Sequence, residues 1–311
     1  MRVQQYSPSA REAWDLFIEG AKNATFLFNR NYMEYHSDRF VDHSVMFFDE
    51  SRLVAVMPAN SKDGTLHSHG GLTFAGIVSD RQMSVGVMLR LFDALLAYLR
   101  ERHIVRVVYR RSPYIYHTVP AEEDLYALFR HRASLIRRDV SSAICMNERL
   151  RPAKGRRWSA KRASKHGLDV RESHDFERFM AIAADQLHRR YRLVPTHTSA
   201  EIQMLAARFP RNIRLFGAYK GLDLLGGAIV YESSRVAHVQ YMTASDDGRE
   251  LAALDRVLDV LLNDTYAGIP YFDFGISTEA EGRYVNAGLT AYKESFGARA
   301  VVYDTYELEV P

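Results

Sequence analysis

Apolar residues recur along the chain with two spacings, which predict alternating helices and strands. From Val85 to Leu99 they return every three or four residues, as on an amphipathic helix, whereas Val236–Met242 alternates polar and apolar positions like a half-buried strand. These spacings predict helices over Ala10–Gly20, Arg30–Asp38, Val85–Leu99, Glu122–Arg130, Phe176–Arg190, Ser199–Phe209 and Arg249–Asn263. They predict strands over Val45–Phe48, Leu53–Met57, Ile104–Arg110, Ser134–Met146, Ile213–Tyr219, Leu224–Tyr231, Val236–Met242, Tyr271–Phe274 and Ala300–Glu309.

The order of predicted elements in the first half of the chain is repeated in the second half. Each half reads as helices, two or three strands, a long helix, a strand, a helix and a final strand. Two copies of one unit of about 140 residues fit the usual size of a domain. We therefore expect an α/β fold with mixed sheets, with domains at 1–148 and 171–311 joined by a basic linker at 149–170.

The predicted linker is rich in basic side chains. Between 149 and 165 no acidic residue occurs among Arg149, Arg151, Lys154, Arg156, Arg157, Lys161, Arg162 and Lys165. Such a run is usually a solvated face, and its alternative is a phosphate-binding track for a nucleotide, a coenzyme or tRNA.

Composition narrows the class of protein. A net charge of +3 does not favour a DNA-binding protein, and the single cysteine, Cys145, excludes an internal disulfide and a cysteine metal site. The N-terminal residues lack the pattern of a signal peptide, and no apolar run reaches the roughly 20 residues that span a bilayer. We expect a soluble cytoplasmic protein without a membrane span.

A glycine-rich segment in the first half is a candidate ligand loop. His67 and His69 are two residues apart, which places them on one face of an extended backbone, and Gly70 and Gly71 follow directly. Glycines let a backbone approach a ligand closely. The alternative is a glycine-rich bend with two surface imidazoles; a zinc site lacks a third ligand at a suitable spacing.

The C-terminal stretch carries more candidate chemistry. His238 and Gln240 share one face of an alternating strand, and a histidine there can act as a base near neutral pH. Tyr241 and Tyr292 are candidate proton donors to a leaving group. Asp273 could orient an ammonium group. Each has a purely structural alternative, such as a core histidine or a turn carboxylate.

The order of elements in each half resembles the N-acyltransferase (GNAT) fold. The duplication, the linker Lys154–Ala163 and the ending from Gly288 to Gly297 resemble the Fem-type tandem acyltransferases. The resemblance implies acyl transfer from a thioester or an aminoacyl ester to an amine. Lys293 matches the family lysine that faces an anionic group, and Asp273 lies on the strand beside it. The loop with His67, His69, Gly70 and Gly71 occupies the acceptor side. Tyr292 belongs to the matching ending, and Asn286 lies two residues before it.

The donor is less well defined by the resemblance. Coenzyme-A-dependent members usually carry a glycine-rich pyrophosphate loop before the long helix, where this chain has Gly248 and Arg249 after two carboxylates, Asp246 and Asp247. Helix N-terminal amides could still bind phosphate. Acyl-CoA is therefore one predicted donor and charged tRNA the other, and no metal is expected.

Together these features predict an N-acyltransferase. Its catalytic candidates are His238, His69, Asp273 and Lys293, its substrate-binding candidates His67, Gly70, Gly71, Gln240, Tyr241, Asn286 and Tyr292, and its cofactor-binding candidates Gly248 and Arg249. The resemblance implies an amino sugar or nucleotide-linked sugar of envelope polysaccharide synthesis as acceptor. The alternatives are an aminoacyl-tRNA-dependent transferase of the peptidoglycan-bridge type and a non-catalytic ligand-binding protein.

Overall fold

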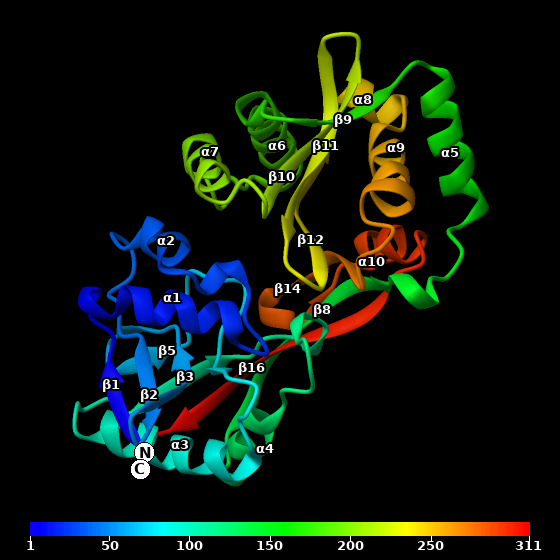
Figure 1. Cartoon of the computed structure of the whole chain (residues 1–311). Coiled ribbons are helices and arrows are strands. Elements are labelled where there is room, and N and C mark those ends of the chain that lie inside the picture. Colours follow the sequence, from blue (N-terminus) through cyan, green and yellow to red (C-terminus); the bar gives the residue numbers. More distant parts are fainter. The chain divides into compact units, whose positions relative to one another are not determined.

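The computed structural model describes residues 1–311, except for the side chain of Tyr191, and the chain forms two compact units (Figure 1). Unit 1 comprises Met1–Val140, Thr278–Tyr284 and Val302–Pro311; unit 2 comprises Ser141–Ser277 and Val285–Val301. Two long strands, β8 (Ser134–Cys145) and β16 (Arg299–Glu309), contribute residues to both. Both units mix helices with strands, as the sequence predicts; the domain boundaries predicted from the sequence stay a prediction.

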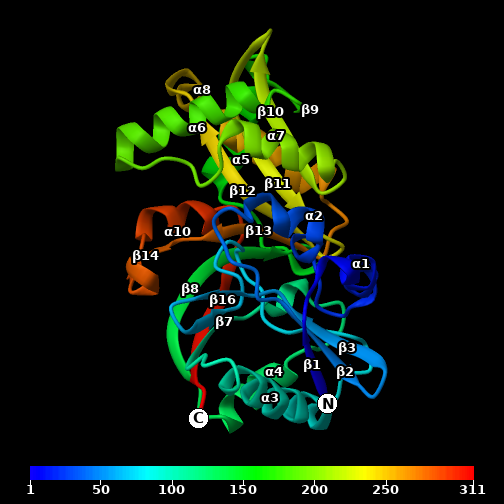
Figure 2. The same cartoon turned by 90° about the vertical axis from the view of Figure 1, so that its left-hand side faces the viewer.

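Unit 1 is built on two groups of strands. One antiparallel sheet has the order β1-β2-β3-β6, and a second group runs β4-β5-β7-β16 with β5 and β7 parallel. Helices α3 and α4 lie side by side (Figure 2), and the apolar face of α3 is buried in the core. The bounds are β1 Arg2–Gln5, α1 Arg11–Gly20, α2 Arg30–Met33, β2 Val45–Asp49, β3 Arg52–Met57, β4 Asn60–Lys62, β5 Thr65–His67, β6 Val78–Ser79, α3 Val85–Arg100, β7 Arg106–Arg110, α4 Glu123–Arg130 and β14 Thr278–Glu279.

Unit 2 is a sheet with helices on both faces. Its strands follow the order β8-β13-β12-β11-β10-β9, with β12 and β13 parallel and β9 to β12 antiparallel. Helices α6 and α7 cover one face, and α9 covers the other, with α5 packed outside it (Figure 1). The bounds are α5 Lys154–Lys165, β9 Asp169–Ser173, α6 Phe176–Tyr191, α7 Ser199–Arg208, β10 Ile213–Lys220, β11 Asp223–Glu232, β12 Val236–Ala244, α8 Asp246–Glu250, α9 Ala253–Val260, β13 Tyr271–Ile276, β15 Tyr284–Val285 and α10 Ala287–Glu294.

The long helix predicted over Arg249–Asn263 is broken, which corrects that prediction. Ala252 takes the left-handed conformation, with φ 57° and ψ 41°, and separates the short helix α8 from α9. A non-glycine residue rarely adopts this conformation, and the spacing of apolar residues along the sequence does not indicate it. Ser245 begins α8 by accepting a hydrogen bond from the Gly248 amide. The short helix α8 and the break at Ala252 therefore form the connection between β12 and α9.

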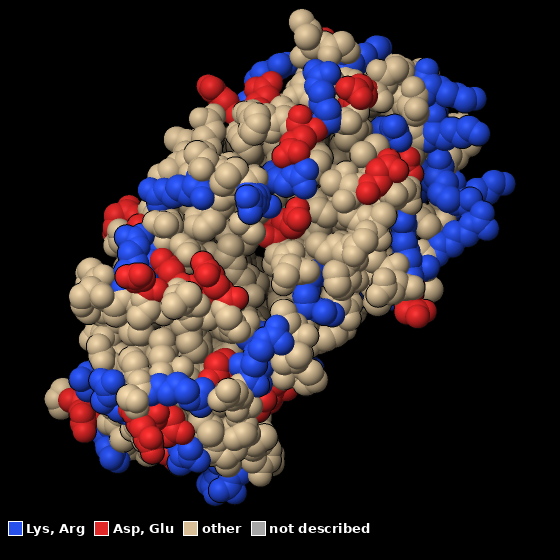
Figure 3. All heavy atoms as spheres, viewed as in Figure 1, with Lys and Arg blue, Asp and Glu red and all other residues tan. Residues whose placement is uncertain are grey.

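The basic segment of the chain forms α5. Ala160 and Ala163 are buried and pack toward α9, because small side chains allow two helices to approach closely. Most Lys and Arg side chains of α5 are exposed and gather along this helix (Figure 3), whereas Arg156 pairs with the buried Asp255. Among the described residues, no helix is both long enough and apolar enough to cross a membrane.

Candidate active site

The two parallel strands of unit 2 separate at one defined position. Their register ends with His238 opposite Asp273. Immediately beyond, Gln240 is an extra residue of β12 relative to β11, and the β13 register toward β8 shifts between Asp273 and Ile276. A bulge bends a strand and increases its twist. The two bulges therefore account for the opening between β12 and β13, and ligands of open α/β sheets bind at such strand ends.

His238 and Asp273 form a hydrogen-bonded pair at this opening. The Nδ1 atom of His238 lies 2.8 Å from Oδ2 of Asp273, which is completely buried. The carboxylate also accepts hydrogen bonds from the Ser141 hydroxyl and, at 3.2 Å, from the Gly275 amide. An ionised carboxylate fixes the proton on Nδ1 and leaves Nε2 as the basic nitrogen. In the described part of the chain, Nε2 has no hydrogen-bond partner, so this pair can accept a proton.

Lys293 of α10 lies next to this pair. Its Nζ donates to the carbonyl oxygens of Gly275 and Ile276 at 2.7 and 2.9 Å, and only 3% of the residue is exposed. An ammonium group has three N–H donors, so one remains for a ligand. Burial lowers the pKa of Lys293 to about 8, against the opposing effect of the Asp273 carboxylate. The sequence alone could not show that this lysine is buried.

A pocket of about 680 Å³ lies beside the second half of β12. Helix α6, the turn between β12 and α9, and α10 close it, and most of its lining is apolar. Of the residues predicted from the sequence, it collects Gln240, Tyr241, Gly248, Arg249 and Tyr292. Its other lining residues are Ala183, Gln186, Leu187, Arg190, Met242, Thr243, Ala244, Ala252, Ala253, Leu254, Asp255 and Leu289. We call this space the β12 pocket.

The charges at the β12 pocket differ from those that the sequence suggests. Asp246, which would repel a phosphate, is paired with Arg249 and, at 2.8 Å, with Arg189. Arg249 also donates to Gln186 and to the Ala244 carbonyl. Arg190 adds a second guanidinium to the lining. Two arginines therefore line the pocket, and the carboxylates of Asp246 and of the lining residue Asp255, which pairs with Arg156, are both in ion pairs.

Two tyrosines of the pocket have different environments. The Tyr241 hydroxyl lies 2.8 Å from Nδ1 of His197 and accepts from the His197 amide, so it holds the segment before α7. The Tyr292 hydroxyl is buried without a hydrogen-bond partner among the described residues. Burial raises the pKa of Tyr292, and the Asp255 carboxylate adds to the effect. Tyr292 therefore keeps its proton and can donate it to a ligand.

The remaining candidates lie elsewhere. Asn286 caps α10 through the Leu289 amide. His67, His69, Gly70 and Gly71 belong to unit 1. There His69 stacks on His36, with ring centres 4.9 Å apart, and burial lowers the pKa of His69 to about 3. These contacts describe a neutral, packed imidazole, and the assigned roles of these four residues stay predictions.

Sequence reasoning missed three residues of the site. Ser141 comes from β8 and Arg190 from α6, both distant in sequence from the C-terminal stretch, and Asp255 is buried in the first turn of α9. The basic pair Arg189 and Arg190 near the end of α6 is a sequence signal that could have indicated Arg190. Among the described residues, no group of His, Cys, Asp and Glu side chains could hold a metal ion.

Residues 152–294 match the family described as an acetyltransferase (GNAT) domain. A comparison with curated protein sequences found no match. That family match spans most of unit 2, including the His238–Asp273 pair, Lys293 and the β12 pocket.

Solved structures share the fold of nearly the whole chain. FemX is 12% identical, with 98% of this chain and 97% of that chain covered and a TM-score of 0.66. The C-terminal domain of a putative lysylphosphatidylglycerol synthetase from Agrobacterium fabrum is 14% identical, with 98% and 92% covered and a TM-score of 0.63. A tandem GNAT protein from the clavulanic acid pathway is 11% identical, with 100% and 98% covered and a TM-score of 0.53. The resemblance to the GNAT fold and to Fem-type proteins is confirmed: residues 152–294 match a GNAT acetyltransferase domain, which supports an acyltransferase, and nearly the whole chain shares its fold with FemX and with a tandem GNAT protein.

Proposed function

We propose that the protein is an N-acyltransferase whose donor lies in the β12 pocket and whose acceptor amine is deprotonated by His238. The observation that carries the proposal is the Asp273–His238 pair, at the position where β12 and β13 separate. An amine must lose a proton to become a nucleophile toward an acyl group, and a positioned histidine is the usual base. The buried carboxylate keeps the imidazole in the required tautomer.

The pocket fits a donor that carries phosphate groups. GNAT domains generally use acyl-CoA, whose thioester supplies an activated acyl group. Arg190 and Arg249 would hold its phosphates, together with the first amides of α9, a helix that begins without a side-chain cap. The apolar lining suits the rest of such a donor. Pairing of Asp246 with two arginines reduces the repulsion that the sequence suggests from Asp246 and Asp247.

Two further side chains complete the proposed chemistry. Lys293 fixes the Gly275 and Ile276 carbonyls, and its remaining N–H stabilises negative charge on the acyl oxygen as the amine attacks. The Tyr292 hydroxyl, buried at the pocket wall, protonates the leaving group. His238 thus takes a proton on one side of the reaction and Tyr292 gives one on the other.

The acceptor is proposed from the resemblance to Fem-type proteins: an amino sugar or nucleotide-linked amino sugar of envelope polysaccharide synthesis. A second candidate is aminoacyl transfer from a charged tRNA. The fold of FemX and the basic outer face of α5 favour that alternative. Both candidate reactions would use His238 as the base, Lys293 as the cation and Tyr292 as the acid, and they differ only in donor and acceptor.

One assay separates these candidates. The purified chain is incubated with acetyl-CoA or longer acyl-CoA and a panel of amino sugars and nucleotide-linked amino sugars, and release of free thiol is followed. A parallel series uses tRNA charged with a radiolabelled amino acid. Thiol release that requires an amino sugar and is lost in His238→Gln supports the first candidate. Label transfer from tRNA, without thiol release from any acyl-CoA, supports the second candidate and rejects the first.

A further inference from the structure

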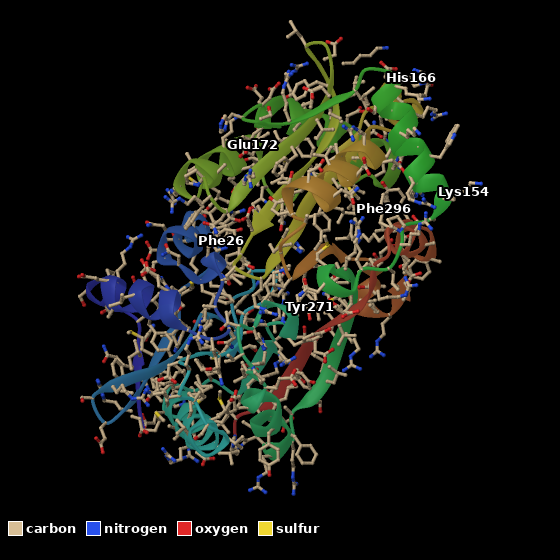
Figure 4. All side chains as sticks on the ribbon, turned by 45° about the vertical axis from the view of Figure 1, so that its right-hand side comes forward. Phe26, Lys154, His166, Glu172, Tyr271 and Phe296 are labelled. Atoms are coloured by element: carbon tan, nitrogen blue, oxygen red, sulfur yellow. The ribbon has the colours of Figure 1, made fainter. Side chains whose placement is uncertain are left out.

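A second cavity of about 480 Å³ is lined by residues of α5, of α9 and of the segment before α5, together with Phe296, which follows α10. Four arginines line it, against two aspartates: Arg149, Arg151, Arg156, Arg157, Asp255 and Asp259. Figure 4 shows Lys154 at the N-terminal end of α5 and Phe296 after the end of α10; Phe296 belongs to the cavity lining. We call this space the arginine pocket.

The carboxylates of the arginine pocket already have partners. Asp255 pairs with Arg156 at 3.2 Å, and Asp259 pairs at 3.0 Å with Arg256, which is not among the lining residues. Among the described residues, no carboxylate forms an ion pair with Arg149, Arg151 or Arg157. Three of the four arginines that line this cavity therefore form no ion pair of their own. A folded protein usually avoids such a cluster, because like charges repel one another.

Arg149 is the most informative member of this cluster. Its Nη1 donates to the Leu262 carbonyl and to the side chain of Asn263, while its Nε is buried and has no partner. Burial lowers the pKa of this guanidinium. A buried donor without an acceptor costs about 1–3 kcal/mol, and more when it is charged. A ligand with several acceptor oxygens would satisfy it.

We propose that the arginine pocket binds the phosphate groups of a phosphorylated small molecule. Guanidinium groups bind phosphate through two parallel hydrogen bonds, which makes arginine the preferred residue for such oxygens. The lining also has apolar members, which suit a ring or alkyl part of the same ligand: Leu150, Pro152, Ala160, Leu262 and Phe296. The volume is in the range of small-molecule sites.

The arginine pocket is separate from the proposed donor site but shares one wall with it. Asp255 lines both cavities, and Arg156 stacks on Tyr292, 4.4 Å from the ring centre. The experiment must therefore show which cavity holds the ligand. Pyrophosphate is a suitable probe because it presents two phosphate groups without a nucleoside or an acyl chain.

The test measures pyrophosphate binding by titration calorimetry, with Trp158 fluorescence as a local signal. Trp158 follows Arg157 and is 61% exposed. Saturable binding is expected, with an affinity reduced about tenfold or more in Arg151→Gln/Arg157→Gln. Both residues are exposed, so the variant should fold normally. The matched control, Lys161→Gln/Lys165→Gln, removes two charges from α5 outside the pocket and should bind like the unaltered protein.

Two results would overturn the inference. Equal loss of binding in the two double variants would indicate a diffuse attraction to the basic helix, as for an RNA. Binding lost in Arg190→Gln/Arg249→Gln but kept in Arg151→Gln/Arg157→Gln would place pyrophosphate in the β12 pocket alone. That outcome rejects the arginine pocket and leaves the proposed acyltransferase function standing.

Discussion

His238 and Asp273 face each other at the last paired position of β12 and β13, with Nδ1 of the histidine 2.8 Å from Oδ2 of the aspartate. The place where the strands separate is therefore also the place where the proposed base is held. We expect His238→Gln to lower kcat/KM by about 10²–10⁴-fold, the usual contribution of a general base. Asp273→Asn should lower kcat to a similar extent, since an amide N–H that donates to Nδ1 would hold the imidazole in the wrong tautomer. Steady-state kinetics, with a melting curve to verify folding, would measure both.

Ser141→Ala serves as the comparison for this pair. It removes one donor to Asp273 and leaves the histidine in place. A decrease in kcat/KM of about threefold to tenfold is expected, as for the loss of one hydrogen bond. If His238→Gln stayed within threefold of the unaltered enzyme, the base would have to be sought elsewhere.

Tyr292→Phe should separate catalysis from stability. The hydroxyl is buried without a hydrogen-bond partner, so its removal leaves no unpaired group and should leave the melting temperature unchanged or higher. If the hydroxyl protonates the leaving group, kcat falls by about 10²-fold while KM for the donor changes little. Tyr241→Phe is the matched control: it breaks hydrogen bonds to His197 and should cost about 1 kcal/mol of stability. An unchanged kcat in Tyr292→Phe would exclude it as the acid.

The sequence predicted much of this arrangement, and the failures have physical causes. The spacing of apolar residues identified β12, β13 and α6, because burial of one face imposes a period. The same spacing wrongly predicted α8 and α9 as one helix, because the left-handed conformation of Ala252 does not change the spacing of apolar residues. The sequence indicated His238, Asp273 and Lys293 separately. The contacts of Ser141 with Asp273 and of Asp246 with Arg189 could not be predicted, since each joins segments that are distant in the sequence.

Arg249→Gln should weaken donor binding rather than the chemical step. A hydrogen bond from a charged group contributes about 1.5–3 kcal/mol, so KM for a phosphate-bearing donor should rise about tenfold to a hundredfold. Arg256→Gln is the control, because this arginine is on α9, pairs with Asp259 and does not line the β12 pocket. Equal KM values for the two variants would show that Arg249 does not bind the phosphate groups of the donor.

Two glycines should respond in opposite directions to alanine. A Cβ at Gly248 would lie 2.1 Å from the Leu225 carbonyl oxygen, so Gly248→Ala must shift the backbone and should cost about 1–3 kcal/mol. A Cβ at Gly155 of α5 meets nothing within 4 Å. Gly155→Ala should therefore stabilise the protein by about 0.5–1 kcal/mol, because alanine favours the helix. Denaturant unfolding measures both, and a neutral Gly248→Ala would contradict the tight turn between β12 and α9.

Lys293 gives a pH dependence with opposite signs for activity and stability. Burial lowers its pKa to about 8 from the ordinary 10.5. If its positive charge stabilises the reacting oxygen, kcat decreases as the pH rises through about 8. Stability changes in the other direction. Between pH 8 and 10.5 the unfolded chain holds the proton that the folded chain has lost, so the free energy of unfolding due to this residue increases with pH over that window.

Two variants isolate the Lys293 effect from other titrations. Lys293→Met removes both trends, so the difference in unfolding free energy between it and the unaltered protein should change by about 2–3 kcal/mol from pH 8 to 10.5. Lys293→Arg keeps a charge that does not titrate below pH 12, so whatever activity it retains should lack the decrease near pH 8. A decrease that persists in Lys293→Arg would belong to another group. Since the ammonium also holds two carbonyl groups of β13, only this pH profile distinguishes an electrostatic role in catalysis from a structural one.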